Sequence, residues 1–206
     1  MTKIIVPKKV ARNKMLQFVY KTSIIIYSLY ITFSAQVFAL EAEAPLGSQS
    51  FQNLIFDETA ALERKAREDA EKLRLERIAK IESYFGRHDL PLQDEAQHFV
   101  DAAEEYNIDW RLVAAIGFIE STGGKFSCKT AEYSAFGWGS CKIDFDSYKE
   151  SIDVISWNLG GHNPNTDHWY YQGQDHKELL ETYNPPHVRP DYAFLVMREM
   201  DIIDAQ

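Results

Sequence analysis

The chain of 206 residues is long enough for one compact domain with additional segments. Hydrophobic residues make up 45% and charged residues 26%, which excludes a chain that is disordered throughout. The formal net charge is −9, and no basic patch occurs outside the N-terminus, so electrostatic binding to nucleic acid is not expected. Two cysteines can form neither a multi-disulfide scaffold nor a cysteine-rich zinc module.

The N-terminal segment has the pattern of an export signal. The first 21 residues contain six basic side chains and no acidic one, and a mostly apolar run follows over 23–33. The small residue Ala39 then provides the expected cleavage site. We expect residues 1–39 to be a cleaved signal peptide or, through 22–40, an uncleaved membrane anchor with its basic flank in the cytoplasm. Either way, the rest of the chain is expected in the cell envelope or outside the cell.

Residues 40–55 are predicted to form a linker, and residues 56–85 one long charged helix. The helical stretch contains neither Gly nor Pro, and oppositely charged residues recur four positions apart. Its apolar stripe combines leucine with alanine, buries little area and shifts along the helix. The segment is therefore interpreted either as a spacer or coiled coil that binds a partner protein, or as a solvated helix that packs a weak stripe on the next domain.

Residues 90–206 are predicted to form a mainly α domain. Apolar residues recur there at helical spacing, and two segments beginning at Ser147 and Asp175 have the signature of a helix-capping box. The expected helices cover 92–106, 110–120, 152–159, 175–183 and a final segment from Pro190. Strands do not alternate with these helices and no glycine-rich phosphate loop occurs, which excludes a Rossmann or P-loop fold.

Glu120 is the strongest candidate for a catalytic group on physical grounds. It follows Leu112 and Ile116 at helical spacing, so it lies on the apolar face of its helix. It also lies at the helix C-terminus, where the dipole disfavours a negative charge, and both effects raise its pKa. General-acid cleavage of a glycosidic bond requires a carboxylic acid that stays protonated near neutral pH. The alternative is a helix-end carboxylate that points into water.

Three motifs resemble those of lysozyme-like lytic transglycosylases. Glu120 ends a predicted helix and is followed by Ser121 and by Thr-Gly-Gly over 122–124, which is similar to the first motif of that family. Ala-Phe-Gly-Trp-Gly over 135–139 corresponds to its glycine-aromatic segment, and Thr-Tyr-Asn over 182–184 to its Ala-Tyr-Asn motif. The resemblance covers about 90–201. It implies a lysozyme-like all-α catalytic domain that acts, without a cofactor, on the glycan strands of peptidoglycan.

The same resemblance implies roles for individual residues. Glu120 is the expected acid/base, and Tyr183 is expected near it or near the substrate N-acetyl group. The expected substrate contacts are Ser121, Ser134, Phe136, Gly137, Trp138 and Asn184. The aromatic rings among them are expected either to stack on sugars or to belong to the core. Phe-Gly-Trp-Gly replaces the usual Gly-Leu-Met-Gln, and Ser134 replaces a common Asn, which affects the sugar contacts more than the acid.

The order of the motifs is also similar to that of bacterial endo-N-acetylglucosaminidases, which share the fold and would use Tyr183 and Tyr192 as late-motif tyrosines. A hydrolase needs a second carboxylate, about 5–5.5 Å or 6.5–9.5 Å from the first. Glu132, Asp144 and Asp146 are the candidates in the loop. A transglycosylase needs only one acid, because the muramyl 6-hydroxyl is an intramolecular nucleophile.

Export makes a disulfide between Cys128 and Cys141 the expected state of the two cysteines. We expect no metal site, because the histidines at 162, 168 and 176 match no helical spacing of ligands. The expected function is thus cleavage of peptidoglycan by the transglycosylase route. The alternatives are a hydrolase, either a muramidase or an endo-N-acetylglucosaminidase, and an inactive glycan-binding module whose charged helix recruits partners.

Overall fold

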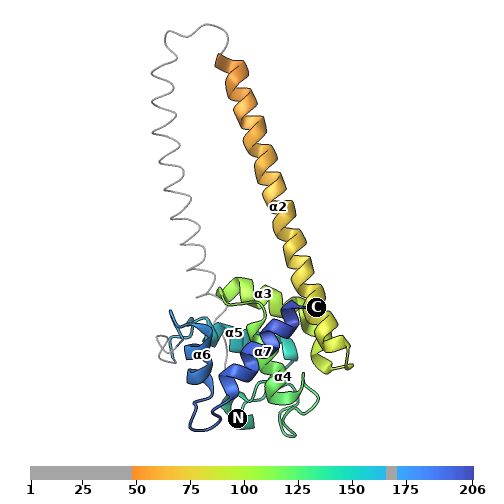
Figure 1. Ribbon diagram of the computed structural model, residues 1–206, viewed down its shortest axis with the longest axis vertical. Coiled ribbons are helices and arrows are strands. Elements are labelled where there is room, and N and C mark those ends of the chain that lie inside the picture. The colour runs from red at the N-terminus through yellow and green to blue at the C-terminus, as the bar shows by residue number, and fades with distance from the viewer. Residues whose placement is uncertain (1–47, 166–170) are drawn as a thin grey trace. The chain divides into compact units, whose positions relative to one another are not determined.

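The computed structural model describes residues 48–165 and 171–206. Within these residues the chain is mainly helical and has no strand, which confirms the predicted mainly α class. The elements in chain order (Figure 1) are α2 (Ser48–Gly86), the 3-10 helix η2 (Pro91–Glu95), α3 (Ala96–Tyr106), α4 (Leu112–Ser121), the 3-10 helix η3 (Trp138–Cys141), α5 (Tyr148–Leu159), α6 (His176–Tyr183) and α7 (Tyr192–Asp204).

Helix α2 begins at Ser48, so the predicted linker over 40–55 is wrong for residues 48–55. The physical reason is that neither Gly nor Pro interrupts the chain between Ser48 and Gly86. The rest of that linker, and the predicted signal or anchor over 1–39, lie outside the described residues. Among the residues that are described, we find no helix both long enough and apolar enough to span a bilayer.

The chain divides into two units between Glu71 and Lys72. In the first unit, α2 carries apolar side chains that are open to solvent, with Leu62 62% exposed. Glu63 and Arg67 pair on its surface at 3.6 Å, one helical turn apart. Leu62 on this part of α2 is therefore not covered by the other described residues.

The second unit, which contains residues 72–206, has a core of aromatic rings. The last turns of α2 bury Phe85, which stacks on Phe99 of α3 with ring centroids 5.9 Å apart. Phe99 in turn meets Phe136 edge to face at 6.3 Å. Each such buried side chain contributes about 1.5–3 kcal/mol. The last turns of α2 therefore share an aromatic core with the elements that follow them.

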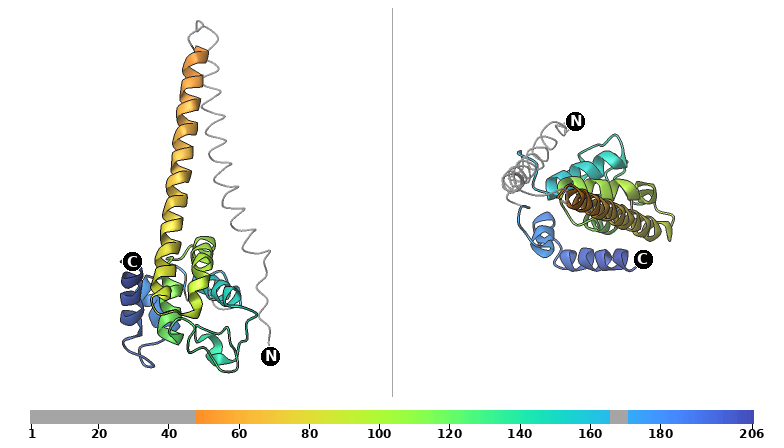
Figure 2. Two further views of the ribbon diagram at one scale, coloured as in Figure 1. Left: turned by 90° about the vertical axis from the view of Figure 1, so that its right-hand side faces the viewer. Right: turned by 90° about the horizontal axis from the view of Figure 1, so that it is seen from above.

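Helix α4 is central to this unit. Its residues from Leu112 to Ile116 are at most 3% exposed, because α4 packs on α7 and also contacts α5. Helix α3 packs on α5, and α6 packs on α7, beside which it lies in Figures 1 and 2. This arrangement brings α5 and α7 against the helix that carries Glu120, with α6 packed on α7.

The C-terminal end of α4 is fixed by left-handed backbone conformations. Thr122 has φ 53°, and its N–H donates to the Phe118 carbonyl at 2.8 Å. Gly123 follows with φ 64°, and a Cβ at that position would lie 2.9 Å from Cδ1 of Leu90. Only glycine satisfies both the conformation and the space, so the chain turns sharply there.

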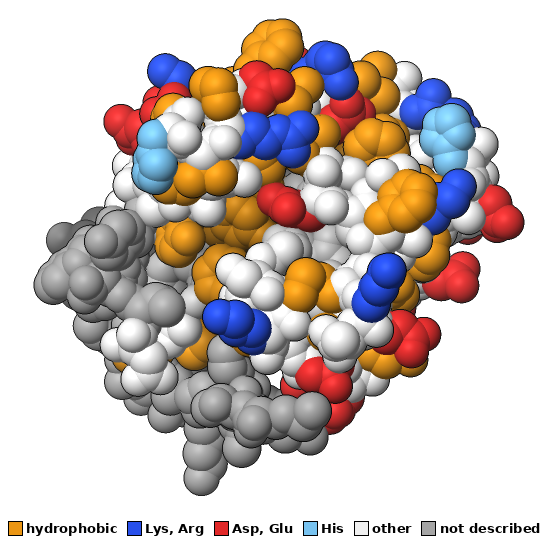
Figure 3. Space-filling model, turned by 90° about the horizontal axis from the view of Figure 1, so that it is seen from below, with side chains coloured by type: hydrophobic (Ala, Val, Ile, Leu, Met, Phe, Trp, Pro, Cys, Tyr) orange, Lys and Arg blue, Asp and Glu red, His pale blue; other side chains and the backbone are white. Residues whose placement is uncertain are grey.

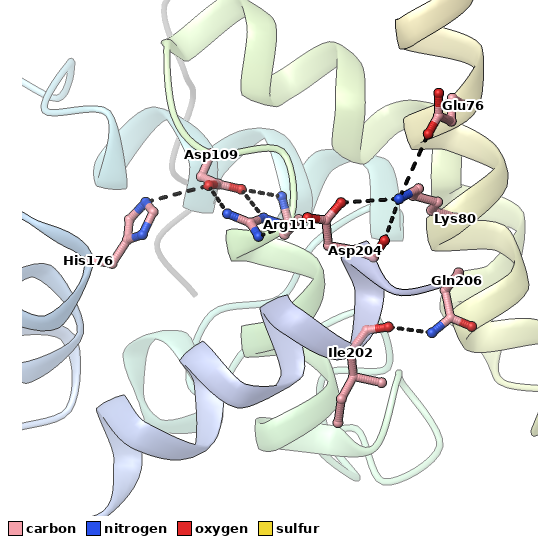
Figure 4. A network of polar contacts seen from close by, with 8 residues as sticks. All are labelled: Glu76, Lys80, Asp109, Arg111, His176, Ile202, Asp204 and Gln206. Atoms are coloured by element: carbon pink, nitrogen blue, oxygen red, sulfur yellow. Dashed lines mark hydrogen bonds and ion pairs between the residues drawn. The ribbon is translucent and has the colours of Figure 1, made fainter.

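An ionic network holds the start of α4 (Figure 4). Arg111 donates to the two carboxylate oxygens of Asp109 at 2.9 and 2.7 Å, and lies 3.6 Å from Asp204 at the end of α7. Lys80 of α2 lies 3.1 Å from the Asp204 carboxylate, and His176 of α6 lies 3.7 Å from Asp109. Burial raises the pKa of Asp109, but the hydrogen bonds from Arg111 outweigh it and lower that pKa.

A buried hydrogen bond joins α2 to α7. The Tyr84 hydroxyl donates to Oε2 of Glu199 at 2.8 Å, and Arg198 donates to Oε1 at 2.9 Å. A buried carboxylate without such partners would strongly destabilise the fold. This bond therefore fixes the position of α7 relative to the end of α2.

The capping signals mark two helix starts correctly. Asp175 and Glu178 form the full reciprocal box at α6. At α5, Ser147 accepts from the Glu150 N–H at 3.1 Å, whereas the Glu150 carboxylate accepts from the N–H of Asp146. Only half of the predicted box is therefore present at α5.

Cys128 and Cys141 form the predicted disulfide. The two residues are 13 positions apart, so the bridge closes a loop that contains Phe136 and Gly137. A cross-link of this length removes conformational freedom mainly from the unfolded chain.

Replacing both cysteines by serine should lower the free energy of unfolding by about 3 kcal/mol, because the unfolded chain regains the freedom of that loop. Urea unfolding of the full-length protein measures the change, with Lys129→Gln, an exposed neighbour, as the control. Reaction of both thiols of the unreduced, denatured protein with a maleimide would show that the bridge is absent.

Candidate active site

Glu120 lies in the last turn of α4 and is hydrogen-bonded to α7. Its side chain is half-buried, and Oε1 accepts a hydrogen bond from the hydroxyl of Tyr192 at 2.7 Å. Tyr192 is the first residue of α7 and is fully buried. The packing of α4 on α7 therefore supplies the acid with a fixed donor from a distant part of the sequence.

Burial raises the pKa of Glu120 above its ordinary value. The hydrogen bond from Tyr192 and the positive charge of Arg189 oppose this rise, but the net shift stays upward, so the predicted direction is confirmed. Burial, with Tyr183 and Glu120 nearby, also raises the pKa of Tyr192. The phenol therefore stays protonated and acts as the donor in this pair.

The backbone at Gly137 borders the second carboxylate oxygen. Gly137 has φ 64°, a conformation that favours glycine. A Cβ at this position would lie 2.6 Å from Oε2 of Glu120, so any side chain would collide with the acid. The loop closed by the disulfide thus approaches Glu120 through its backbone.

Tyr183 is a neighbour of the acid without a hydrogen bond to it. Its hydroxyl donates to the backbone carbonyl of Phe136, and its ring stacks on Tyr192 at 6.0 Å with an interplanar angle of 14°. The ring of Trp138 lies 5.8 Å from that of Tyr183. Burial and the charge of Glu120 raise the pKa of Tyr183. The direct bond to the carboxylate therefore comes from Tyr192, while Tyr183 fixes the ring of Tyr192 by stacking.

Three of the predicted substrate contacts are buried parts of the fold. Ser121 is 4% exposed, and its hydroxyl donates to the carbonyl of Gly117 at 3.0 Å and accepts from the N–H of Gly124 at 2.9 Å. Phe136 is 1% exposed and belongs to the aromatic core, and Ser134 is 2% exposed. The structure thus places these three side chains inside the fold, where Ser121 closes the turn after α4 and Phe136 fills the core.

The other predicted contacts are more accessible. Gly137 is exposed, and Trp138 and Asn184 are partly exposed. Within the described residues, Oδ1 of Asn184 and Oγ of Ser134 are buried atoms without a hydrogen-bond partner, which is uncommon. Ser134 lies two residues before Phe136, and Asn184 directly follows Tyr183. The hydrogen bond from the Tyr183 hydroxyl to the Phe136 carbonyl joins these two segments.

The described residues place no second carboxylate against Glu120. The three candidates Glu132, Asp144 and Asp146 are exposed. None of them is hydrogen-bonded to Glu120 or contributes to its pKa. A carboxylate close by would raise that pKa further through like-charge repulsion.

The described residues contain no group of three or more potential metal ligands. The ring of His162 is hydrogen-bonded to the Tyr106 carbonyl at 3.2 Å, and His176 belongs to the network of Asp109. His168 lies outside the described residues.

A shallow depression of about 510 Å³ lies at the end of α2, lined by Ala79, Glu82, Ser83, Gly86, Arg87 and Gln93. None of these is a predicted site residue. We therefore place the candidate site at Glu120, whose pKa is raised and whose carboxyl group accepts a hydrogen bond from Tyr192. On the face of the molecule shown in Figure 3, hydrophobic and uncharged side chains surround a recess that holds an acidic side chain, with Lys and Arg at its margin.

No family model, curated protein or solved structure matches the chain. The site is therefore defined by the geometry of its own residues. Two residues of the site, Tyr192 and Arg189, are difficult to predict from the sequence. The motifs indicate Tyr192 only under the hydrolase alternative, and nothing in them indicates Arg189, which comes near the acid through the loop before α7.

Tyr192→Phe should raise the pKa of Glu120, because the lost hydrogen bond favours the ionised form. Carboxyl-labelled glutamate observed by NMR during a pH titration measures this pKa directly. Tyr183→Phe is the matched control, since its hydroxyl bonds Phe136, and it should leave the titration almost unchanged. A lower pKa in the Tyr192 variant would contradict the assignment.

Glu120→Gln should leave the protein at least as stable as the parent at neutral pH, with a gain on the order of 1 kcal/mol. The pKa of Glu120 is higher in the folded protein than in the unfolded chain, where it is near 4.3. The contribution of the protonated carboxyl to stability is therefore complete below the unfolded pKa, and it is lost as pH rises through the folded pKa. Thermal melts at acidic and neutral pH measure the difference, with the exposed Glu132→Gln as control. Clear destabilisation at neutral pH would identify ionised Glu120 as a satisfied structural partner.

Proposed function

We propose that the chain is an exported lytic transglycosylase that cleaves peptidoglycan glycan strands with Glu120 as its single acid/base. The observation that carries this proposal is a half-buried carboxyl group with a raised pKa, oriented by the Tyr192 hydroxyl at 2.7 Å. The three motifs that resemble lysozyme-like lytic transglycosylases support it, because Gly137 and Tyr183 of the second and third motifs border Glu120.

In the first step, protonated Glu120 donates its proton to the glycosidic oxygen, and the bond from that oxygen to the muramyl C1 breaks. The raised pKa favours the protonated form that this step requires. Tyr192 stabilises the carboxylate that results, because its hydroxyl already donates to Oε1. The transferred proton leaves with the new 4-hydroxyl of the released sugar.

In the second step, the Glu120 carboxylate accepts the proton of the muramyl 6-hydroxyl while O6 bonds to C1. This closes a 1,6-anhydro ring and returns Glu120 to its protonated form. The nucleophile belongs to the same sugar, so no water has to be positioned. Atoms and charge balance with one carboxyl group.

The one-acid route is favoured over hydrolysis by the surroundings of Glu120. A hydrolase uses a second carboxylate to stabilise or attack the sugar, or to activate water. The three exposed candidates in the loop neither bond to Glu120 nor shift its pKa. The disulfide between Cys128 and Cys141 supports a site of action outside the cytoplasm, since such bonds persist in oxidising compartments.

Purified full-length protein should release muropeptides with 1,6-anhydro ends from isolated sacculi, as identified by mass spectrometry. Glu120→Gln keeps the shape of the side chain but removes the transferable proton, so the rate should fall at least about 10²-fold. Glu132→Gln is the control and should retain the parental rate. Products with reducing ends would indicate a hydrolase, and unchanged turnover by the Glu120 variant would refute the assignment of the acid.

A further inference from the structure

The loop between α6 and α7 presents an arginine at the edge of the candidate site. Arg189 lies between Pro186 and Pro190, and proline restricts the backbone freedom of this short segment. Its N–H donates to the carbonyl of Pro185 at 3.1 Å, and its own carbonyl accepts from the N–H of Tyr192 at 3.2 Å. The backbone that carries this guanidinium is therefore held directly against the residue that donates to Glu120.

The Arg189 side chain is seated on the site and is only partly neutralised. Its guanidinium carbon lies 5.8 Å from the centre of the Tyr192 ring, and its positive charge acts on Glu120. Nε pairs with Asp191 at 3.6 Å, where the two side chains are 43% and 59% exposed. An ion pair this exposed contributes little. The terminal nitrogens of Arg189 have no hydrogen bond or ion pair to any described residue.

A guanidinium with free terminal nitrogens is suited to one class of ligand. Its planar fork donates two parallel hydrogen bonds to a carboxylate, which gives geometric specificity as well as affinity. Peptidoglycan strands carry carboxylates beside the bond to be cut, on the lactyl group of muramic acid or on the attached peptide. Neutral polymers of N-acetylglucosamine carry none.

We propose that Arg189 binds a carboxylate of the substrate beside the scissile bond, and so makes the site selective for acidic glycan strands over neutral N-acetylglucosamine polymers. This inference rests on the proposed function, because it takes the bond at Glu120 as the one that is cleaved. It adds a specificity-determining residue to that site and assigns the chemical class that the residue recognises.

The test measures binding to full-length Glu120→Gln, which does not consume the ligand. The probes are glycan strands freed of peptide, which keep the lactyl carboxylate, and the same strands after conversion of that carboxylate to a neutral amide. Adding Arg189→Gln should weaken binding of the acidic strands about tenfold or more, and leave the amidated strands bound as before. Arg189→Lys keeps the positive charge but loses the planar fork. Its affinity for the acidic strands should lie between that of the protein with Arg189 and that of the Arg189→Gln variant. Lys149→Gln, which removes an exposed charge on α5, is the control and should change neither affinity.

Equal binding of acidic and amidated strands by Glu120→Gln, or an equal loss with both probes in the Arg189→Gln variant, overturns the inference. The same holds if Lys149→Gln weakens binding as much as Arg189→Gln does. A cleavage assay with sacculi and the parent protein distinguishes failure of this inference from failure of the proposed function.

If anhydro products are released in a Glu120-dependent manner but binding is not selective for the carboxylate, only the role of Arg189 is refuted. Carboxylate-selective binding through Arg189 without any cleavage supports the role of Arg189 in binding and removes the enzymatic proposal.

Discussion

The hydrogen bond from Tyr192 to Glu120 is the interaction on which the candidate site depends. A carboxyl group that is partly withdrawn from water favours its neutral form, and it needs a nearby donor if it is to ionise during a reaction. That donor comes from the first residue of α7, and the packing of α4 on α7 holds it at 2.7 Å. The surrounding features serve this contact: the stacked ring of Tyr183 supports Tyr192, and the bare backbone of Gly137 leaves room for the acid.

Much of this arrangement can be predicted from local sequence. Helical periodicity places Glu120 on the apolar side of its helix, and the caps at Ser147 and Asp175 mark helix starts, because these signals involve neighbours within a few residues. Boundaries are less predictable. Pro91 allows a 3-10 turn before α3, and nothing in the sequence before Phe56 prevents α2 from continuing back to Ser48.

Tertiary choices could not be predicted in the same way. Tyr183 and Tyr192 both lie at a helix boundary, and the packing of the helices decides which hydroxyl reaches the carboxylate. Ser121 and Phe136 illustrate a related difficulty. A residue inside a motif can be required because it closes a turn or fills the core, and its place in the motif does not distinguish that requirement from contact with a ligand.

The buried bond between Tyr84 and Glu199 has a mechanical consequence. It connects the last turns of α2 to α7, and the pair between Lys80 and Asp204 joins the same two helices at 3.1 Å. Glu199 lies seven residues after Tyr192, about two turns further along the same side of α7. A load on the last turns of α2 would therefore reach the helix that carries Tyr192 through these two polar contacts.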